Sequence, residues 1–261
     1  MQARAYSTLL VAAADGVCTL TLNRPEKKNA IGSVMVNDLL YALEDAHADA
    51  SVRVIVVTGA GDAFCAGGDF SQMTGGAEGE ALPHKGDYRD LLLALWRATK
   101  PVIARVNGAA LGGGLGIVAA STFAVASTSA KLGTPEVNVG LFPFMIAAVL
   151  ERVMGRRALV RMMLLGERYD GARAAELGLV SEAVAPDELD AAVARTVSAV
   201  LDKSPRTLEL GLRALSDTEE LPLDEKLPIL GDRLAECLAT EDAREGLLAF
   251  LQRRKPVWTG R

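Results

Sequence analysis

The sequence predicts an α/β fold, and two features support this class. Segments with strand patterns alternate with segments of helical spacing through roughly the first two thirds of the chain. Two of the strand segments, 52–59 and 101–108, are continuous apolar runs, as expected for strands covered on both faces. The 261 residues are 50% hydrophobic and only 5% aromatic, which suffices for a sizeable core of small side chains.

The first half of the chain predicts alternating elements with clear ends. In order, they are a strand in 16–25, a helix over 33–49, a strand over 52–59, a helix over 85–100 and a strand over 101–108. Pro25 and Pro101 end the first strand and the second helix, because proline cannot donate a backbone hydrogen bond. Ser33 is expected to cap the first helix.

Residues 107–121, NGAALGGGLGIVAAS, place five glycines at the head of a predicted buried helix. A strand is expected over 122–128. Thr134 and Pro135 then predict a helix start that places Glu136 in the first turn. Residues 106–130 lack charged side chains, but polar residues and glycines interrupt them, which favours a strand, a turn and a helix over a membrane span.

The second half of the chain is predicted to be mainly helical. From about residue 145 the pattern is helical, 173–184 returns to a strand, and amphipathic helices follow from about 187 to the end. We expect a core region over 1–190 that carries the functional site and a helical region over 191–261. The leucines of this second region need a partner surface, either the core or a neighbouring subunit.

Several familiar chemistries are missing from the sequence. There is no GxSxG elbow and no GK[ST] phosphate loop, and the glycine-rich GGGLGI and GAGDAF both fail the dinucleotide pattern GxGxxG at its last position. Two histidines and three widely spaced cysteines offer no metal-ligand spacing. The net charge of −5 argues against nucleic acid as a partner. The cysteine usage, with no signal peptide recognised, predicts a cytoplasmic protein.

Five segments together resemble the crotonase (enoyl-CoA hydratase/isomerase) superfamily. They are RPEKKNA, FCAGGDF after VTGAGDA, KPVIARVNGAALGGG, PEVNVGLFP and LLGERYDGARAAELGLV, in that order from residue 24 to 180. The resemblance runs from about residue 5 to 256. It implies a crotonase-like spiral of repeated ββα units, with C-terminal helices that form homotrimers or dimers of trimers. It further implies an acyl-CoA thioester substrate, with no metal and no cofactor other than the coenzyme A of the substrate.

The resemblance also assigns the catalytic groups. The backbone amides of Gly68 and Gly113 match the family's oxyanion donors, and Glu136 matches one of its two glutamates. Such donors stabilise the negative charge that develops on a thioester oxygen when a neighbouring carbon loses its proton. The other hydratase glutamate would stand at Gly116, which has no side chain. We expect an apolar pocket of Phe142 and Phe144 around Glu136.

The family further suggests residues for binding the substrate and its coenzyme A. Lys28 is a candidate for phosphate contact, although a solvated turn is an equal explanation, and the backbone of Ala66 matches a position that faces adenine. Asp69 is a weaker candidate for a second acid, or a residue that holds the loop backbone. The remaining candidates are Gly112, Phe144, Phe250 and Arg253, the last two often reaching the ligand in a neighbouring subunit. The polar segment 71–87 is expected to be a loop that gates or shapes the acyl pocket.

One carboxylate suits the movement of a double bond, because a single base takes a proton from one carbon and returns it to another. Hydration remains open if Glu136 handles both protons or if water or an anion fills the space at Gly116. Decarboxylase, hydrolase or dehalogenase chemistry, a catalytically silent acyl-CoA-binding protein and a dinucleotide oxidoreductase also remain open. Neither nucleic acid nor a membrane is an expected partner.

Overall fold

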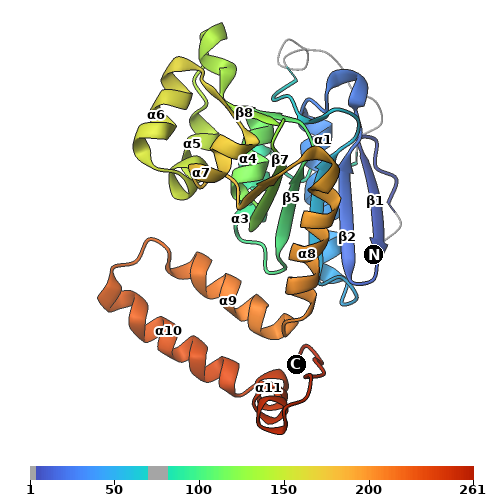
Figure 1. Ribbon diagram of the computed structural model, residues 1–261, viewed down its shortest axis with the longest axis vertical. Helices are drawn as coiled ribbons and strands as arrows, with labels where there is room; N and C mark the ends of the chain where they lie inside the picture. Colours follow the sequence, from blue (N-terminus) through green and yellow to red (C-terminus); the bar gives the residue numbers. More distant parts are fainter. Residues whose placement is uncertain (1–3, 70–81) are drawn as a thin grey trace.

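Two β-sheets with helices around them form the described part of the protein (Figure 1). The computed structural model describes residues 4–69 and 82–261. Most of the segment that the sequence predicts to be a gating loop therefore lies outside the described residues.

The larger sheet has six strands in the order β1-β2-β3-β5-β7-β10. These strands are β1 (Leu9–Ala14), β2 (Val17–Leu22), β3 (Val54–Gly59), β5 (Val102–Val106), β7 (Phe123–Ser127) and β10 (Glu182–Val184). β1 and β2 form an antiparallel hairpin, whose turn is made by Asp15 and Gly16 with positive φ angles. All other neighbours in this sheet are parallel.

The smaller sheet has four strands in the order β4-β6-β8-β9. They are β4 (Ala63–Cys65), β6 (Ala109–Leu111), β8 (Lys131–Gly133) and β9 (Arg168–Asp170). β4 directly follows β3, β6 follows β5 and β8 follows β7, so each successive pair contributes one strand to each sheet. The helices α3 (Tyr88–Trp96) and α4 (Gly113–Ala120) follow the first and second pairs. The expected spiral of ββα units is confirmed.

Helices cover both faces of the larger sheet. On one face, α1 (Ser33–Ala48), α3 and α4 share a large apolar core with Ile55 and Val57 of β3. On the other face, α8 (Leu189–Leu201) packs against Val54 and Val56. This two-sided covering explains why β3 is apolar at successive positions.

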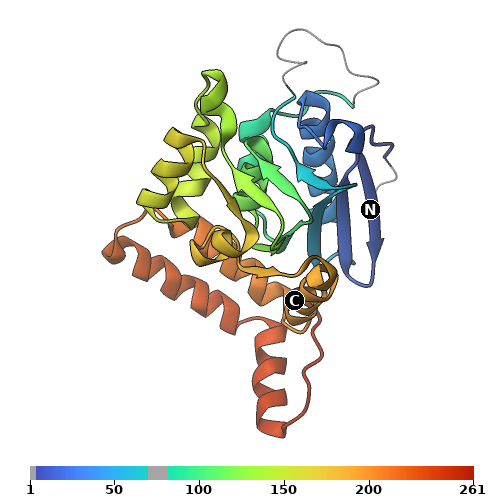
Figure 2. The same cartoon turned by 45° about the horizontal axis from the view of Figure 1, so that its top comes forward.

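The remaining helices form two groups. α5 (Phe144–Val153), α6 (Arg156–Leu165) and α7 (Gly171–Glu176) lie beside α4 and the smaller sheet. α9 (Pro205–Thr218), α10 (Leu223–Leu238) and α11 (Glu241–Gln252) form a C-terminal helical arm, from which α11 projects in Figure 2. Three short 3₁₀ helices are η1 (Pro25–Lys27), η2 (Pro135–Val139) and η3 (Pro186–Glu188).

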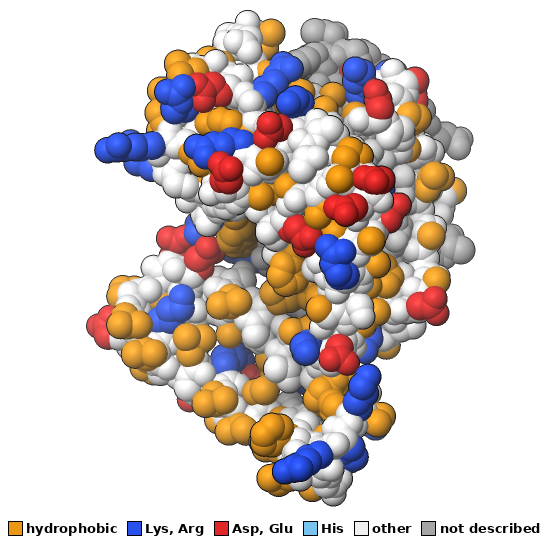
Figure 3. All heavy atoms as spheres, in the orientation of Figure 1, with side chains coloured by type: hydrophobic (Ala, Val, Ile, Leu, Met, Phe, Trp, Pro, Cys, Tyr) orange, Lys and Arg blue, Asp and Glu red, His pale blue; other side chains and the backbone are white. Residues whose placement is uncertain are grey.

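The arm is tied to the core where α9 ends. The Trp96 indole N–H donates a hydrogen bond to the Glu219 carboxylate (2.9 Å), and the Arg152 guanidinium of α5 pairs with the same carboxylate (3.0 Å). Within the arm, the Ser204 hydroxyl at the N-cap of α9 donates to the Asp242 carboxylate of α11 (2.7 Å). Figure 3 shows the surface hollowed between the body and the arm, with hydrophobic side chains gathered on the arm. In the described ranges, no helix has the length and apolar character needed to cross a bilayer.

Candidate active site

The turn after β4 leaves the Gly68 amide without an acceptor among residues 4–69 and 82–261. The neighbouring strand-like residue Ile31 donates its N–H to the Gly67 carbonyl (2.8 Å) and accepts from the Asp69 N–H (2.9 Å). These two bonds fix the peptides on either side of Gly68. Within the described ranges, no acceptor bonds to the Gly68 N–H. The turn also needs glycine at residue 67, whose φ of 110° lies in the left-handed region.

The start of α4 presents a second free donor. Gly112 occupies the N-cap with φ of 50°, and its N–H donates to the Gly133 carbonyl (2.9 Å). Gly113 is the first residue of α4, so its N–H is one of the amides that a helix leaves unpaired. In the part of the chain that the structure describes, this N–H has no acceptor. The positive end of the helix dipole strengthens the donor.

A cavity of about 210 Å³ lies between these two turns and η2. Its lining residues are Ala66, Gly67, Gly68, Gly112, Pro135, Glu136, Asn138, Val139 and Arg168. The structure therefore brings together the first donor, the N-cap of the second donor's helix and the candidate base. Glu136 is the one carboxylate among these lining residues, all of which lie in the described ranges.

Glu136 enters the cavity from η2. Its Oε1 lies 2.6 Å from the position that a Cβ atom would take at Gly112, so only glycine permits this approach. Its Oε2 is buried and has no hydrogen-bond partner in the described part of the chain. Burial raises the pKa of the Glu136 carboxyl above its ordinary value, because the charged form loses water.

The helix start predicted before Glu136 is only partly correct. Thr134 does hold the N-cap position and Pro135 follows it, but the element is a five-residue 3₁₀ helix. The Thr134 hydroxyl does not cap this helix and instead donates to the Met162 carbonyl of α6 (3.0 Å). The side chain thus ties the segment that carries Glu136 to a neighbouring helix.

Tyr88 is a site residue that sequence reasoning missed. It is the first residue of α3, where Asp87 and Asp90 form a capping box. Its hydroxyl donates to the Gly113 carbonyl (2.5 Å), and a Cβ atom at Gly116 would overlap this hydroxyl. Burial raises the pKa of the Tyr88 phenol well above its ordinary value, and the nearby Glu136 charge adds to the shift.

Comparisons with known proteins identify the family of this chain. The family model described as enoyl-CoA hydratase/isomerase matches residues 12–261. The chain belongs to this family.

A probable enoyl-CoA hydratase of Rhizobium meliloti is 36% identical over 96% of this chain and 97% of its own. The 2,3-dehydroadipyl-CoA hydratase of Escherichia coli is 35% identical over 98% and 100%. The crystal structure of an enoyl-CoA hydratase from Mycobacterium smegmatis superposes with a TM-score of 0.88, at 33% identity over 96% and 98%. The chain is therefore a crotonase-superfamily enzyme.

The side chain of Asp69, the candidate second acid, is buried and makes ion pairs with two basic residues. It is 8% exposed and pairs with the buried Arg24 guanidinium (3.1 Å) and with the Lys27 ammonium (3.5 Å). It does not line the cavity that contains Glu136. These ion pairs hold η1 against the turn of Gly68, whereas the prediction was that the Asp69 side chain bonds the loop backbone.

Two of the candidate CoA contacts lie together. The Lys28 carbonyl accepts a hydrogen bond from the Ala66 N–H (2.9 Å), and Lys28 has a left-handed φ of 48°. Ala66 lines the cavity, and the Lys28 side chain is exposed. The backbone of Lys28 thus helps to form the donor turn, whatever its side chain binds.

The apolar pocket expected around Glu136 differs from what the structure places there. The rings of Phe142 and Phe144 pack against each other with their centroids 4.8 Å apart, and Phe144 is 76% exposed. Neither ring lines the cavity. Both side chains are at the surface beyond η2, whereas the Glu136 carboxyl group lies against Gly112 at the start of α4.

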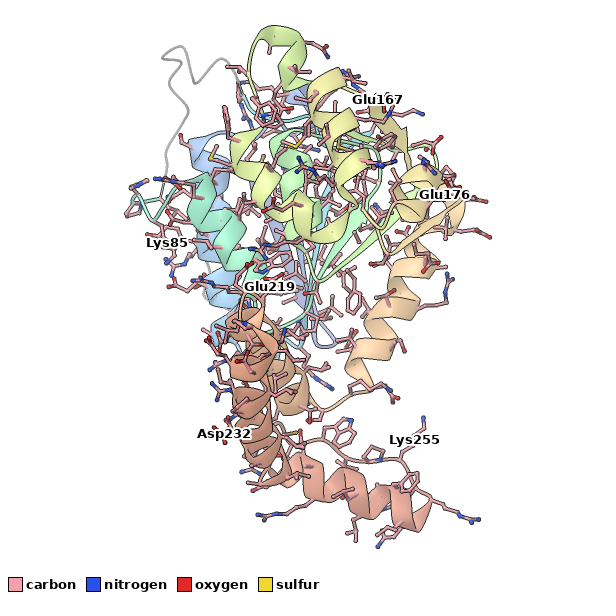
Figure 4. All side chains as sticks on the ribbon, turned by 90° about the vertical axis from the view of Figure 1, so that its left-hand side faces the viewer. Lys85, Glu167, Glu176, Glu219, Asp232 and Lys255 are labelled. Atoms are coloured by element: carbon pink, nitrogen blue, oxygen red, sulfur yellow. The ribbon has the colours of Figure 1, made fainter. Side chains whose placement is uncertain are left out.

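Phe250 and Arg253 are not near the cavity of their own chain. Both belong to the end of α11, and Phe250 is 82% exposed. Figure 4 shows Lys255 at the tip of the arm, far from Glu167, which precedes the cavity residue Arg168. Any contact of these two residues with a ligand therefore requires the cavity of another subunit. Among the described residues, no group of three His, Cys, Asp or Glu side chains is placed to hold a metal ion.

Proposed function

We propose that the enzyme moves the double bond of a 3-enoyl thioester of coenzyme A to the 2-position. The observation that carries this proposal is the single carboxylate, Glu136, among the residues that line the cavity. The site of the other hydratase glutamate is Gly116, and the Tyr88 hydroxyl occupies the adjacent space. A single base suits a reaction that removes and returns one proton.

In the proposed mechanism, the thioester oxygen binds between the amides of Gly68 and Gly113. The Glu136 carboxylate removes a proton from the α-carbon, and the electron pair moves into a dienolate whose oxygen carries the charge. The same carboxyl group then returns the proton to the γ-carbon, which leaves the double bond between the α- and β-carbons. No electron leaves the substrate, so the reaction requires no redox cofactor. Each oxyanion donor contributes about 2.7–4 kcal/mol to the barrier lowering in comparable sites.

Hydration of a 2-enoyl thioester is the second candidate, because the relatives at 35–36% identity are named hydratases. In this case Glu136 would activate water for attack on the β-carbon and return a proton to the α-carbon. Both reactions use the same enolate and the same oxyanion donors. They differ in whether water must be held beside Glu136.

The proposed assembly is a homotrimer or a dimer of trimers. Its support is the C-terminal arm, on which α10 has no buried residue in the single chain. Assembly would also allow Phe250 and Arg253 of one subunit to reach the cavity of another.

The deciding test is a paired assay of the purified protein with trans-3-enoyl-CoA and trans-2-enoyl-CoA. The measured products are the migrated double bond and the 3-hydroxyacyl thioester. Migration without hydration supports the proposal, and efficient hydration of the 2-enoyl thioester favours the second candidate. Binding of both thioesters without turnover would overturn both candidates.

Glu136→Gln identifies the base. The amide keeps the shape of the side chain but cannot take a proton, so kcat should fall by about 10²–10⁴-fold while the dissociation constant for the thioester changes little. Glu151→Gln on the exposed side of α5 is the matched control and should keep full activity. Turnover in Glu136→Gln equal to that of the control would rule out this base.

A further inference from the structure

The space beside Gly116 is filled from α3. A Cβ atom built at Gly116 would overlap the Tyr88 hydroxyl and would come within 2.5 Å of Ile146 Cγ2. Gly116 is buried inside α4, so a side chain there would require Tyr88 and Ile146 to shift. The Tyr88 hydroxyl therefore occupies the space that a carboxylate side chain at position 116 would need.

The same hydroxyl contacts the turn that carries the second oxyanion donor. It donates to the Gly113 carbonyl, and the Tyr88 Cε2 and Cζ atoms lie 3.6 Å from the Cβ position of Gly113. This contact joins residues 25 positions apart in sequence. Residues 112–114 are all glycine, so their backbone has more freedom than any other tripeptide would have. The Gly112 carbonyl, which shares a peptide with the Gly113 N–H, accepts from the Gly116 N–H (3.1 Å), and the Tyr88 hydroxyl adds a contact to the peptide that follows.

The position of Tyr88 is itself well defined. The Asp87 side chain accepts from the Arg89 and Asp90 amides, and the Asp90 carboxylate accepts from the Asp87 N–H (2.8 Å). This reciprocal pair fixes the first turn of α3 and with it the backbone of Tyr88. The ring then lies against the first turn of α4.

We propose that Tyr88 is a positioning and specificity-determining residue: it anchors the Gly113 oxyanion turn and excludes a second acid group from the position of Gly116. The kinetic part of this inference rests on the proposed enoyl-CoA chemistry, whereas the steric part does not. With Tyr88 in place, the cavity carries out proton transfer with Glu136 alone. Replacement of Gly116 by a larger residue is then incompatible with the present packing.

The kinetic test uses Tyr88→Phe, which removes the hydroxyl and keeps the ring. We expect kcat on the thioester that the wild-type enzyme converts to fall about tenfold, with KM changed less than about twofold, because one hydrogen bond that aligns a transition-state donor is lost. Tyr41→Phe on α1, whose ring faces Arg4 and Lys85, is the matched control and should leave both constants unchanged. If Tyr88 had a purely structural role, Tyr88→Phe would lower the melting temperature but would not lower kcat selectively over KM.

The steric test is a double-mutant cycle in thermal stability with Gly116→Ala and Tyr88→Phe. We expect Gly116→Ala to lower the melting temperature less in the Tyr88→Phe background, because the hydroxyl that the new Cβ meets is gone. Ile146 is present in both backgrounds, so its overlap cancels in the comparison. If Gly116→Ala does not fold, the same cycle is measured in the Ile146→Ala background.

Failure of the proposed function can be told apart from failure of this inference. If the wild-type enzyme converts neither thioester, the proposed function fails, and hydrogen exchange at residues 112–116 replaces kcat as the readout. Tyr88→Phe should then exchange these amides faster than Tyr41→Phe. Additive effects in the stability cycle, or wild-type turnover and wild-type exchange in Tyr88→Phe, would overturn the inference.

Discussion

The Glu136 carboxyl group is held where water solvates it poorly. One oxygen lies against the bare Cα of Gly112, and the other is buried without a partner in the described chain. Desolvation is the largest cause of its raised pKa. A base in such a place is stronger than an exposed glutamate, and the fold loses stability to keep it there.

The pH dependence of the enzyme should show this pKa. The folded protein binds the Glu136 proton more tightly than the unfolded chain does. Binding of this proton therefore stabilises the fold fully below pH 4.5, the ordinary pKa of a glutamate, and this stabilisation is lost as the pH rises through the raised pKa of Glu136. Glu136→Gln should therefore melt at a higher temperature than wild type at pH 7, and the difference should shrink toward pH 4. In the wild type, kcat/KM should fall as the pH drops through the same raised pKa.

Calorimetry across this pH range measures the stability effect, and an assay with saturating auxiliary enzymes measures the rate. The exposed Glu151→Gln serves again as the control and should show neither effect. A Glu136→Gln variant that is less stable than wild type at pH 7 would contradict the assigned burial.

At the scale of elements, the helix α4 shows that the four glycines at its start have more than one role. Gly112 gives Glu136 room, and Gly113 presents its amide at the helix start. Gly114 instead permits close packing, because a Cβ atom there would overlap the Cys65 carbonyl and approach Cys65 Sγ to 2.9 Å. Gly116 faces Tyr88. A motif that looks uniform in sequence is thus divided between chemistry and packing.

Alanine substitutions can separate these roles. Gly114→Ala should destabilise the protein by about 1–3 kcal/mol or more, because the new methyl group meets the backbone of β4. Gly211→Ala in α9 is the matched control, since this glycine is exposed in mid-helix and no atom lies within 4 Å of its Cβ position, and it should stabilise by about 0.5–1 kcal/mol. Urea unfolding midpoints provide the measurement. Equal shifts in the two variants would refute the packing role.

Helices and strands that are long enough to show a periodic pattern were predicted from the sequence, whereas most of the short strands were not. The strands β2, β3, β5 and β7 and the helical C-terminal region were predicted and are confirmed. The strand predicted over 173–184 is wrong for most of its length, because α7 extends to Glu176 and only Glu182–Val184 forms β10. The three-residue strands β4, β6, β8 and β9 are too short to show a periodicity, and β1 is rich in alanine and lacks clear alternation. Ser33 is the first residue of α1 rather than its cap, because Gly32 holds the N-cap position.

At the scale of the whole molecule, the C-terminal arm carries a stripe of leucines. Leu223, Leu227, Leu234 and Leu238 on α10 are each more than half exposed and recur at spacings that place them on one helix face. Such a contiguous apolar face is costly to expose to water. This is the physical basis for the proposed assembly.

Charges placed on this stripe should break the assembly. Leu227→Asp combined with Leu234→Asp is expected to convert the trimer or hexamer to monomers, as measured by light scattering after size-exclusion chromatography. Glu225→Gln on the same helix is a control that should leave the mass unchanged. A wild-type protein that is itself monomeric would disprove the proposed assembly.

The sequence by itself determined the α/β class, the order of the main elements and, through its resemblance to the family, Gly68, Gly113 and Glu136 as candidate groups. It could do so because strand and helix periodicities and short motifs are local properties of the chain. Only the tertiary structure placed Tyr88 against Gly113 and Gly116, gave Asp69 its ion pair with Arg24 and moved Phe142 and Phe144 to the surface. These are contacts between elements, and no local pattern encodes which side chain fills a given space.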